Sequence, residues 1–368
     1  MQQTATPYNH PLAAIDVGSN TIHLVVGIPR QQPGIQLETL VDELEFVRLG
    51  AGVSSTGRIA PERFERGLAV LKRLRDLARQ TGAETILCAA TEVLRKAING
   101  PEFLARARAD LGLEIHIISG DQEAALTFWG ATSDRAGQET GAEKTPQDPT
   151  PGRRDAGATS ASVPAGETPA LQVGSAAPVS HPAGTGLAVA DLGGGSMELV
   201  LGLGEQIAWR RSVPLGSGSL HDQFIHSDPP TAGEMAALRA DVAGSLGALD
   251  LPPETHNGGL LIVCGGTATT LLTFSWDALG LSPEQTHLTR EEVGQGIALL
   301  VASPAAEIAE QYGVEVERAR ILGAGASVLA ALMERLGVRQ MEISHRGIRE
   351  GMLLSYARHG AAWLEAAD

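Results

Sequence analysis

The sequence predicts an α/β protein made of two similar domains with a cleft between them. An apolar strand ending in Asp16 is followed by a turn of small residues and a second apolar strand, and this pattern recurs at Asp191. Each copy reads as a tight hairpin and opens the order strand, hairpin, strand, helix. In both halves apolar strands alternate with amphipathic helices, which is typical of α/β domains. The chain therefore looks like an internal duplication.

The first half contains the elements of one complete domain. Its apolar runs predict strands at 12–17, 22–28, 36–49, 84–90 and 114–118. Helices are predicted at 61–80, where Pro61 suits the first helical position, and at 93–110. A further helix at 120–131 follows a capping box from Ser119 to Gln122.

The second half repeats that opening and then becomes richer in helices. A hairpin is predicted over 187–203 and a strand near 206–213, followed by strands near 260–264 and 339–344. Helices are predicted near 231–247, 289–302, 304–312, 315–336 and 345–358. We expect domains at 12–133 and 187–368.

The segment 134–186, between these domains, has a different composition. It has no aromatic residue, seven prolines and many Ala, Gly, Ser and Thr residues. Such a segment cannot bury enough apolar area to offset the entropy lost on ordering. We expect a disordered low-complexity insertion, with a partner-binding role as the alternative.

Charge and hydropathy limit the partners. The 368 residues carry a net charge of −15, which argues against nucleic acid and anionic membrane as partners. The chain has no signal-peptide pattern at its N-terminus and no apolar run long enough to span a membrane, so a cytoplasmic protein is expected. Its two cysteines, Cys88 and Cys264, lie in apolar runs typical of buried strands.

The two hairpin tips are candidate phosphate-binding loops. Small residues let backbone N–H groups approach an anion, and a strand-end Asp can hold a hydrated cation beside it. The amides concerned are those of Gly18, Ser19 and Asn20, and of Gly194, Gly195 and Ser196. One such tip could be an ordinary surface turn, but two in matching register favour a clamp. Neither tip has the spacing of a Walker loop or of a dinucleotide fold.

Six motifs in order along the chain resemble those of the exopolyphosphatase/guanosine pentaphosphate phosphatase family. They are Asp16–Thr21, Ala90–Arg95, Ile118–Ala124, Asp191–Glu198, Gly265–Thr267 and Gly347–Gly351. The resemblance spans about 12–354 and implies two duplicated ribonuclease-H-like domains, as in actin, sugar kinases and heat-shock ATPases. It also implies the family's short two-domain form.

The resemblance implies roles for the acidic residues. Glu123 is similar to the family's general base, although the acidic residue often found before it is Gln122 here. The alternative is that Glu123 only complements the helix dipole. Asp191 and Glu198 resemble carboxylates that hold Mg²⁺, with Asp16 as their symmetric partner. For Asp16 the alternative is a hydrogen bond within its own turn.

Other motif residues are candidates for phosphate contacts. Arg95 could stabilise the terminal phosphate, or could be a surface arginine beside Lys96. Gly266 and Thr267 could bind a further phosphate at a helix N-terminus. His23 occupies the position of Glu198 in the other copy, and we expect a structural role for it.

The resulting hypothesis is a Mg²⁺-dependent hydrolase that removes the terminal phosphate of inorganic polyphosphate. Guanosine pentaphosphate 5′-phosphohydrolysis is the nearest alternative, because the same residues would serve it. A phosphotransferase and a non-catalytic alarmone-binding regulator are alternatives of other classes. A homodimer is compatible with the sequence.

Overall fold

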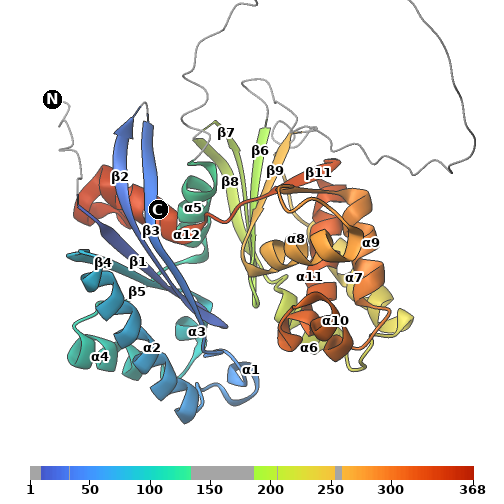
Figure 1. The fold of residues 1–368 in the computed structure, drawn as a ribbon, viewed down its shortest axis with the longest axis horizontal. Coiled ribbons are helices and arrows are strands. Elements are labelled where there is room, and N and C mark those ends of the chain that lie inside the picture. Colours follow the sequence, from blue (N-terminus) through green and yellow to red (C-terminus); the bar gives the residue numbers. More distant parts are fainter. Residues whose placement is uncertain (1–9, 33, 134–185, 205, 253–258) are drawn as a thin grey trace, which may run out of the picture.

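The fold was analysed in a computed structural model, which describes residues 10–32, 34–133, 186–204, 206–252 and 259–368. The expected insertion at 134–186 lies outside the described residues, apart from its last residue. The described part forms two sheets, each with its own helices, and α5 and α12 lie between them (Figure 1).

The first described sheet has the strand order β3-β2-β1-β4-β5. Its strands are β1 (Leu12–Val17), β2 (Thr21–Gln32), β3 (Gly34–Phe46), β4 (Thr85–Ala90) and β5 (His116–Ile117). The first three are antiparallel, whereas β4 lies parallel to β1 and to β5. The accompanying helices are α1 (Val53–Thr56), α2 (Pro61–Gln80), α3 (Glu92–Lys96), α4 (Gly100–Leu111) and α5 (Gly120–Thr132).

The second described sheet repeats this order as β8-β7-β6-β9-β11 and adds β10 at its edge. Its strands are β6 (Gly186–Leu192), β7 (Met197–Leu203), β8 (Gln206–Val213), β9 (Leu260–Cys264), β10 (His287–Thr289) and β11 (Gln340–Ile343). The helices are α6 (Ser217–Phe224), α7 (Ala232–Gly247), α8 (Gly266–Leu279), α9 (Arg290–Leu300), α10 (Ala305–Tyr312), α11 (Val316–Arg335) and α12 (Ile348–His359). Two short 3-10 turns, Gly360–Ala362 and Glu365–Ala367, follow.

The two sheets also match in their irregularities, which supports a duplication. The β2/β3 ladder shifts register between Val26 and Gly27, and the β7/β8 ladder shifts between Leu201 and Gly202. A side chain on Gly202 would meet Gln206 and Phe128 within 2.7 Å, so the bulge needs glycine there.

Two predicted elements differ from the structure. The helix expected at 93–110 is two helices, α3 and α4. The backbone at Ala97 is extended and ends α3, and Pro101 lacks the N–H needed to continue one helix. The strand expected to reach 49 ends at Phe46, because the amides of Val47 and Arg48 bond the Asn20 carbonyl instead of a neighbouring strand. Helices α1 and α6 and strand β10 were not predicted.

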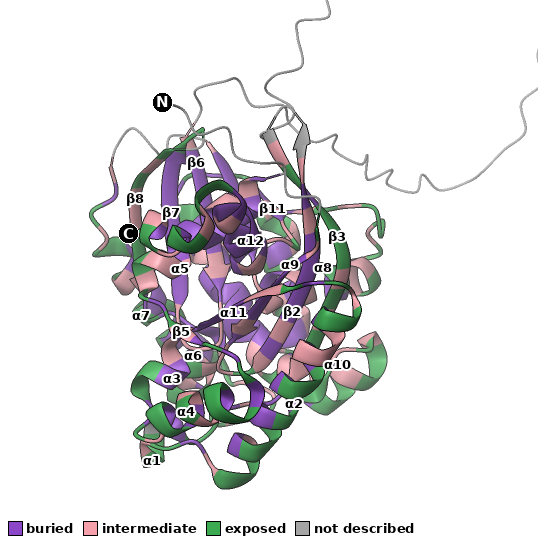
Figure 2. Ribbon diagram, turned by 90° about the vertical axis from the view of Figure 1, so that its left-hand side faces the viewer, coloured by how far each residue is buried: buried purple, intermediate pink, exposed green. Residues whose placement is uncertain are grey.

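Helices α5 and α12 each pack across to the sheet of the other half. In α12, Met352 and Leu353 share a buried cluster with Ala14 of the first sheet. In α5, Phe128 packs with Val189 of the second sheet. The two helices cross closely, since a side chain on Gly351 would lie 1.8 Å from the Leu126 carbonyl oxygen. Figure 2 shows these central elements as mostly buried.

Within the described part of the chain, no helix combines the length and apolar character that a membrane span requires. The cytoplasmic location and the domain limits stay predictions.

Candidate active site

The two hairpin tips meet at a cavity of about 390 Å³ between the sheets. The cavity gathers almost all residues predicted for the site: Asp16, Gly18, Ser19, Asn20, Glu123, Asp191, Gly194, Gly195, Ser196, Glu198, Gly266 and Thr267. Arg95 is not among its lining residues. Long-range folding therefore brings together motifs that are far apart in the sequence.

The two tips have the same local geometry. In the first, the Gly18 amide donates to the Thr21 carbonyl at 3.0 Å, and in the second Gly193 donates to Ser196 at 3.0 Å. The tips touch each other, because a side chain on Gly194 would come within 3.0 Å of the Asn20 side-chain nitrogen. Because residue 194 is glycine, the two tips can lie this close together, and both face one cavity.

Asp16 and Asp191 occupy equivalent positions, because Asp16 pairs with His23 in the β1/β2 register and Asp191 pairs with Glu198 in β6/β7. Burial raises the pKa of Asp16 to about 6, against an opposing effect of the Arg349 charge. Burial and the charge of Glu198 raise the pKa of Asp191 to about 7. Both carboxyl groups are therefore held where an unneutralised negative charge is unfavourable.

Glu198 is fixed by two hydroxyl groups. Ser196 Oγ donates to its Oε1 at 2.9 Å and Ser212 Oγ donates to the same atom at 2.7 Å. Burial raises the pKa of Glu198, and the two serine hydrogen bonds oppose that effect. Its carboxylate is thus oriented before any ligand binds.

Glu123 lies in the first turn of α5, which begins as predicted. The Ser119 hydroxyl accepts from the Gln122 amide, and Gln122 Oε1 accepts from the Ser119 amide at 2.9 Å. Burial raises the pKa of Glu123 well above its ordinary value, and the charges of Glu198, Asp16 and Asp191 add to the effect. The candidate base therefore sits inside a cluster of carboxylates.

Arg95 reaches the edge of this cluster without lining the cavity. Its guanidinium donates to the Ile118 carbonyl, which immediately precedes the α5 capping box. Its charge lowers the pKa of Glu123, in opposition to burial. In the structure Arg95 thus acts electrostatically on the candidate base, and its contact with phosphate stays a prediction.

Three further arginines line the cavity, Arg318, Arg346 and Arg349, and none was assigned to the site from the sequence. Arg318 of α11 lies over the Phe46 ring at 4.9 Å and donates to Thr270 Oγ1 at 3.4 Å. A side chain on Gly266 would come within 2.4 Å of the Arg318 guanidinium, so this cation covers the predicted Gly266 turn. Arg349, in the first turn of α12, has a side chain that is 11% exposed. Arg349 could have been found from the Gly347–Gly351 motif, whereas Arg318 lies in a helix without such a signal.

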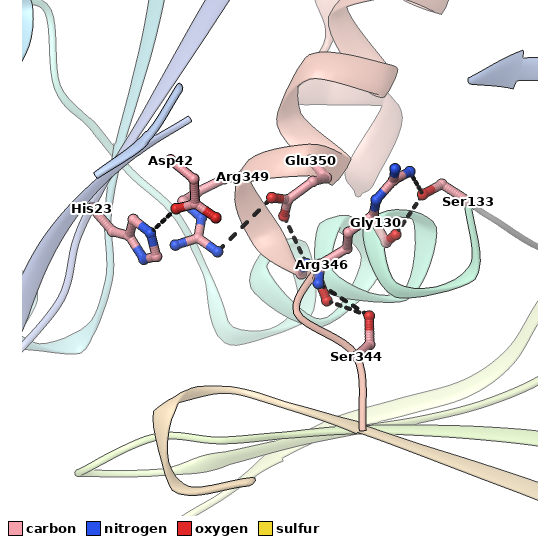
Figure 3. A network of polar contacts seen from close by, with 9 residues as sticks. His23, Asp42, Gly130, Ser133, Ser344, Arg346, Arg349 and Glu350 are labelled. Atoms are coloured by element: carbon pink, nitrogen blue, oxygen red, sulfur yellow. Dashed lines mark hydrogen bonds and ion pairs between the residues drawn. The ribbon is translucent and has the colours of Figure 1, made fainter. Parts of the chain in front are cut away.

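The segment that leads into α12 is tied to the first half by Arg346, whose guanidinium donates to Ser133 Oγ at 3.1 Å (Figure 3). Glu350 caps the helix by accepting from the Gly347 amide at 2.7 Å. His23 contacts Asp42 across β2 and β3, and Arg349 lines the same cavity as this pair. His23 lines the cavity, but its hydrogen bond with Asp42 agrees with the structural role expected for it.

Among the described residues, no three His, Cys, Asp or Glu side chains form a metal site by themselves. The donors nevertheless fit Mg²⁺, which commonly takes one or two carboxylates and completes its shell with water and substrate phosphates. In the described structure Asp16 Oδ1 is buried without a hydrogen-bond partner, and Asp191 and Glu198 lie near enough to repel each other. A divalent cation here would satisfy both observations.

The two sheets share one strand order, and their paired glycine-rich loops lie at a cavity lined by carboxylates, an arrangement suited to binding phosphate. The Ppx/GppA phosphatase family model matches residues 27–141 and 167–359, and the chain belongs to that family.

The family's individual members are similar over most of their length. Exopolyphosphatase 2 of Mycobacterium tuberculosis is 29% identical over 366 residues, which cover 94% of this chain and 98% of that protein. Exopolyphosphatase 1 of Mycobacterium bovis is 25% identical over 346 residues, 93% of this chain and 87% of its own.

Solved structures support the fold. A Ppx/GppA family member from Aquifex aeolicus superposes with a TM-score of 0.71 at 24% identity, covering 96% of this chain and 99% of its own. An exopolyphosphatase from Cytophaga hutchinsonii gives 0.73 at 22% identity, covering 95% and 98%. The predicted α/β fold of two domains with the same strand order is confirmed.

Proposed function

We propose that the protein is a Mg²⁺-dependent exopolyphosphatase that hydrolyses the terminal phosphoanhydride bond of inorganic polyphosphate. The observation that carries this proposal is the position of Glu123, half-buried in the cavity that both glycine-rich tips line and close to three other carboxylates. A carboxylate in that position is suited to accept a proton from a water molecule that attacks a phosphate held by the tips.

In this proposal the chain's own groups divide the work. Amides of Gly18 and Gly194 and their neighbours hold the phosphate oxygens, which fixes the terminal phosphorus in front of the attacking water. Glu123 takes the proton from that water as the new P–O bond forms. Arg349 and Arg318 offset charge that develops on the phosphate oxygens and on the leaving phosphate chain.

The proposed metal site comprises Asp191, Glu198 and Asp16. When bound, Mg²⁺ supplies positive charge that offsets these carboxylates and the phosphate oxygens beside them. The serine hydrogen bonds on Glu198 support its place in this set, because a fixed carboxylate loses less entropy on binding a cation.

Polyphosphate is favoured over guanosine pentaphosphate as substrate by the names of the similar proteins. The relatives from Mycobacterium tuberculosis and Mycobacterium bovis are exopolyphosphatases. Both substrates end in a phosphoanhydride, so the carboxylates and tips serve either one.

Phosphate release from tripolyphosphate, longer polyphosphate and guanosine pentaphosphate, each with Mg²⁺ and with EDTA, tests the proposal. We expect Mg²⁺-dependent release that is fastest from polyphosphate. Faster release from guanosine pentaphosphate would identify that compound, and not polyphosphate, as the substrate. Binding without any turnover would favour an alarmone-binding regulator.

A further inference from the structure

The segment after α12 returns to the first turn of α5, where Glu123 lies. The carbonyl of Trp363 accepts from Ser355 Oγ at 2.7 Å, and the ring of Trp363 stacks edge to face on His116 at 5.9 Å. Trp363 and Ala367 are both buried with residues of α5. Residues 363–368 therefore form an ordered strap against this helix, and Figure 1 places the C mark beside α5.

This strap has polar contacts on both sides. On one side Gln122 Nε2 donates to Asp368 Oδ1 at 2.8 Å. On the other side Arg210 of β8 donates to the carbonyls of Ala367 at 2.8 Å and Asp368 at 2.7 Å. A continuous path thus runs from β8 in the second sheet to the residue directly before Glu123.

Strand β8 also reaches the site through Ser212, which lies two residues from Arg210 and so on the same face of the strand. Ser212 donates to Glu198, and a side chain on Gly120 would come within 2.7 Å of Ser212 Cβ. One strand therefore contacts both the candidate metal ligand Glu198 and the start of the helix that carries Glu123.

We propose that Gln122, Arg210 and Asp368 form a brace that positions the general base Glu123 relative to the carboxylates of the second half. These are positioning residues, since none of them lines the cavity. The proposal rests on the proposed function, because it takes Glu123 as the base.

The brace also gives a physical reason for glutamine at 122. Gln122 uses its oxygen to cap Ser119 and its nitrogen to bind Asp368. A glutamate could still cap the helix, but it would place a second carboxylate against Asp368. Gln122 and Asp368 are therefore expected to be coupled.

A double-mutant cycle that moves the negative charge from residue 368 to residue 122 tests that coupling. Gln122→Glu should lower kcat on tripolyphosphate about tenfold and leave KM within about twofold, because a small displacement of a catalytic group costs rate more than binding. Asp368→Asn alone should stay within about twofold of wild type, because its amide oxygen still accepts from Gln122. In Gln122→Glu/Asp368→Asn the asparagine can donate to the glutamate, and kcat should recover to within about threefold.

Two arginines of β8 provide a matched pair. Arg210→Gln removes the brace and should lower kcat about fivefold, while Arg211→Gln removes the same charge from the exposed, opposite side of the strand and should not. Wild-type kcat in Gln122→Glu, or a double variant as slow as that single variant, would overturn the brace.

Amide hydrogen exchange over residues 120–124 separates this proposal from the proposed function. These amides should exchange at least about tenfold faster in Gln122→Glu and Arg210→Gln and recover in the double variant. If wild type hydrolyses no phosphoanhydride, the proposed function fails while exchange still tests the brace. Unchanged exchange in both single variants would refute it.

Discussion

The two hairpins share a scaffold and differ in the chemistry of equivalent positions. Both have the same turn hydrogen bond, and their ladders carry a bulge at matching positions. Yet Asp191 pairs across the strands with Glu198, which two serines orient, whereas Asp16 pairs with His23, which is engaged by Asp42. The two halves thus share the backbone of the candidate phosphate-binding tips, while two of the three candidate metal carboxylates, Asp191 and Glu198, lie in the second half.

The first half also supplies the candidate base, Glu123, which lies on helix α5 and not on either hairpin. Glu123→Gln is the strongest test of this division. The amide keeps the shape but accepts no proton, so kcat should fall by about 10²–10⁴. Steady-state phosphate release measures the rate, and isothermal titration with tripolyphosphate should show binding retained. Turnover near that of wild type would show that Glu123 is not the base and would point to another carboxylate.

Equivalent substitutions at His23 and Glu198 test whether the halves differ in metal binding. Glu198→Gln should raise the Mg²⁺ concentration for half-maximal activity roughly 10–100-fold, as expected when a metal carboxylate is lost. His23→Gln should change that concentration less than about threefold, because His23 is engaged by Asp42. Titrating Mg²⁺ against initial rate measures both, and equal shifts in the two variants would contradict the asymmetry.

Stability provides a third test, because both strand-end aspartates have raised pKa values in the folded protein. A carboxyl with a raised folded pKa contributes stability below its unfolded pKa, near 4, and this is lost as pH rises through about 6 for Asp16 and about 7 for Asp191. The metal-free protein should therefore become less stable between about pH 4 and pH 7.

Removing either charge should reverse that loss. At pH 8 in EDTA, Asp191→Asn should raise Tm by roughly 3 °C or more, and the gain should disappear at pH 4.5. Asp277→Asn, which changes an exposed aspartate of α8, serves as the control. Differential scanning calorimetry at both pH values measures the effect, and a lower Tm for Asp191→Asn at pH 8 would show that its charge is stabilised.

The sequence predicted the parts of the site that local pattern determines. Hairpin tips, strand-end Asp16 and Asp191, and the cap before Glu123 depend on neighbouring residues, and the structure places them where those patterns indicate. Arg318 lines the cavity from α11, whose sequence predicts an amphipathic helix and nothing about the site. Helices α5 and α12 each pack on the sheet of the other half. That packing depends on contacts between distant segments, such as Met352 with Ala14, which no local pattern encodes.

The smallest expected effect concerns the length of the polyphosphate chain. At a net charge of −15 the chain has few candidates for an extended basic track. Several basic residues that could contribute to one are engaged within the protein. Arg48 pairs with Glu315 at 2.9 Å, Lys96 pairs with Glu92, and Arg210 binds backbone carbonyls.

A long polyanion held through many cycles requires many cationic contacts, each of which adds salt dependence to binding. With those cations engaged, the site should grip only the terminal few phosphates and release the chain between cycles. We therefore expect KM per chain end to vary less than about fivefold between short and long polyphosphate. Gel analysis of a partial digest should show a ladder of intermediates that shifts downward with time. Untouched long chains beside fully degraded product would instead indicate a processive enzyme, and would require a cationic track that forms when the Arg48 and Glu315 pair separates.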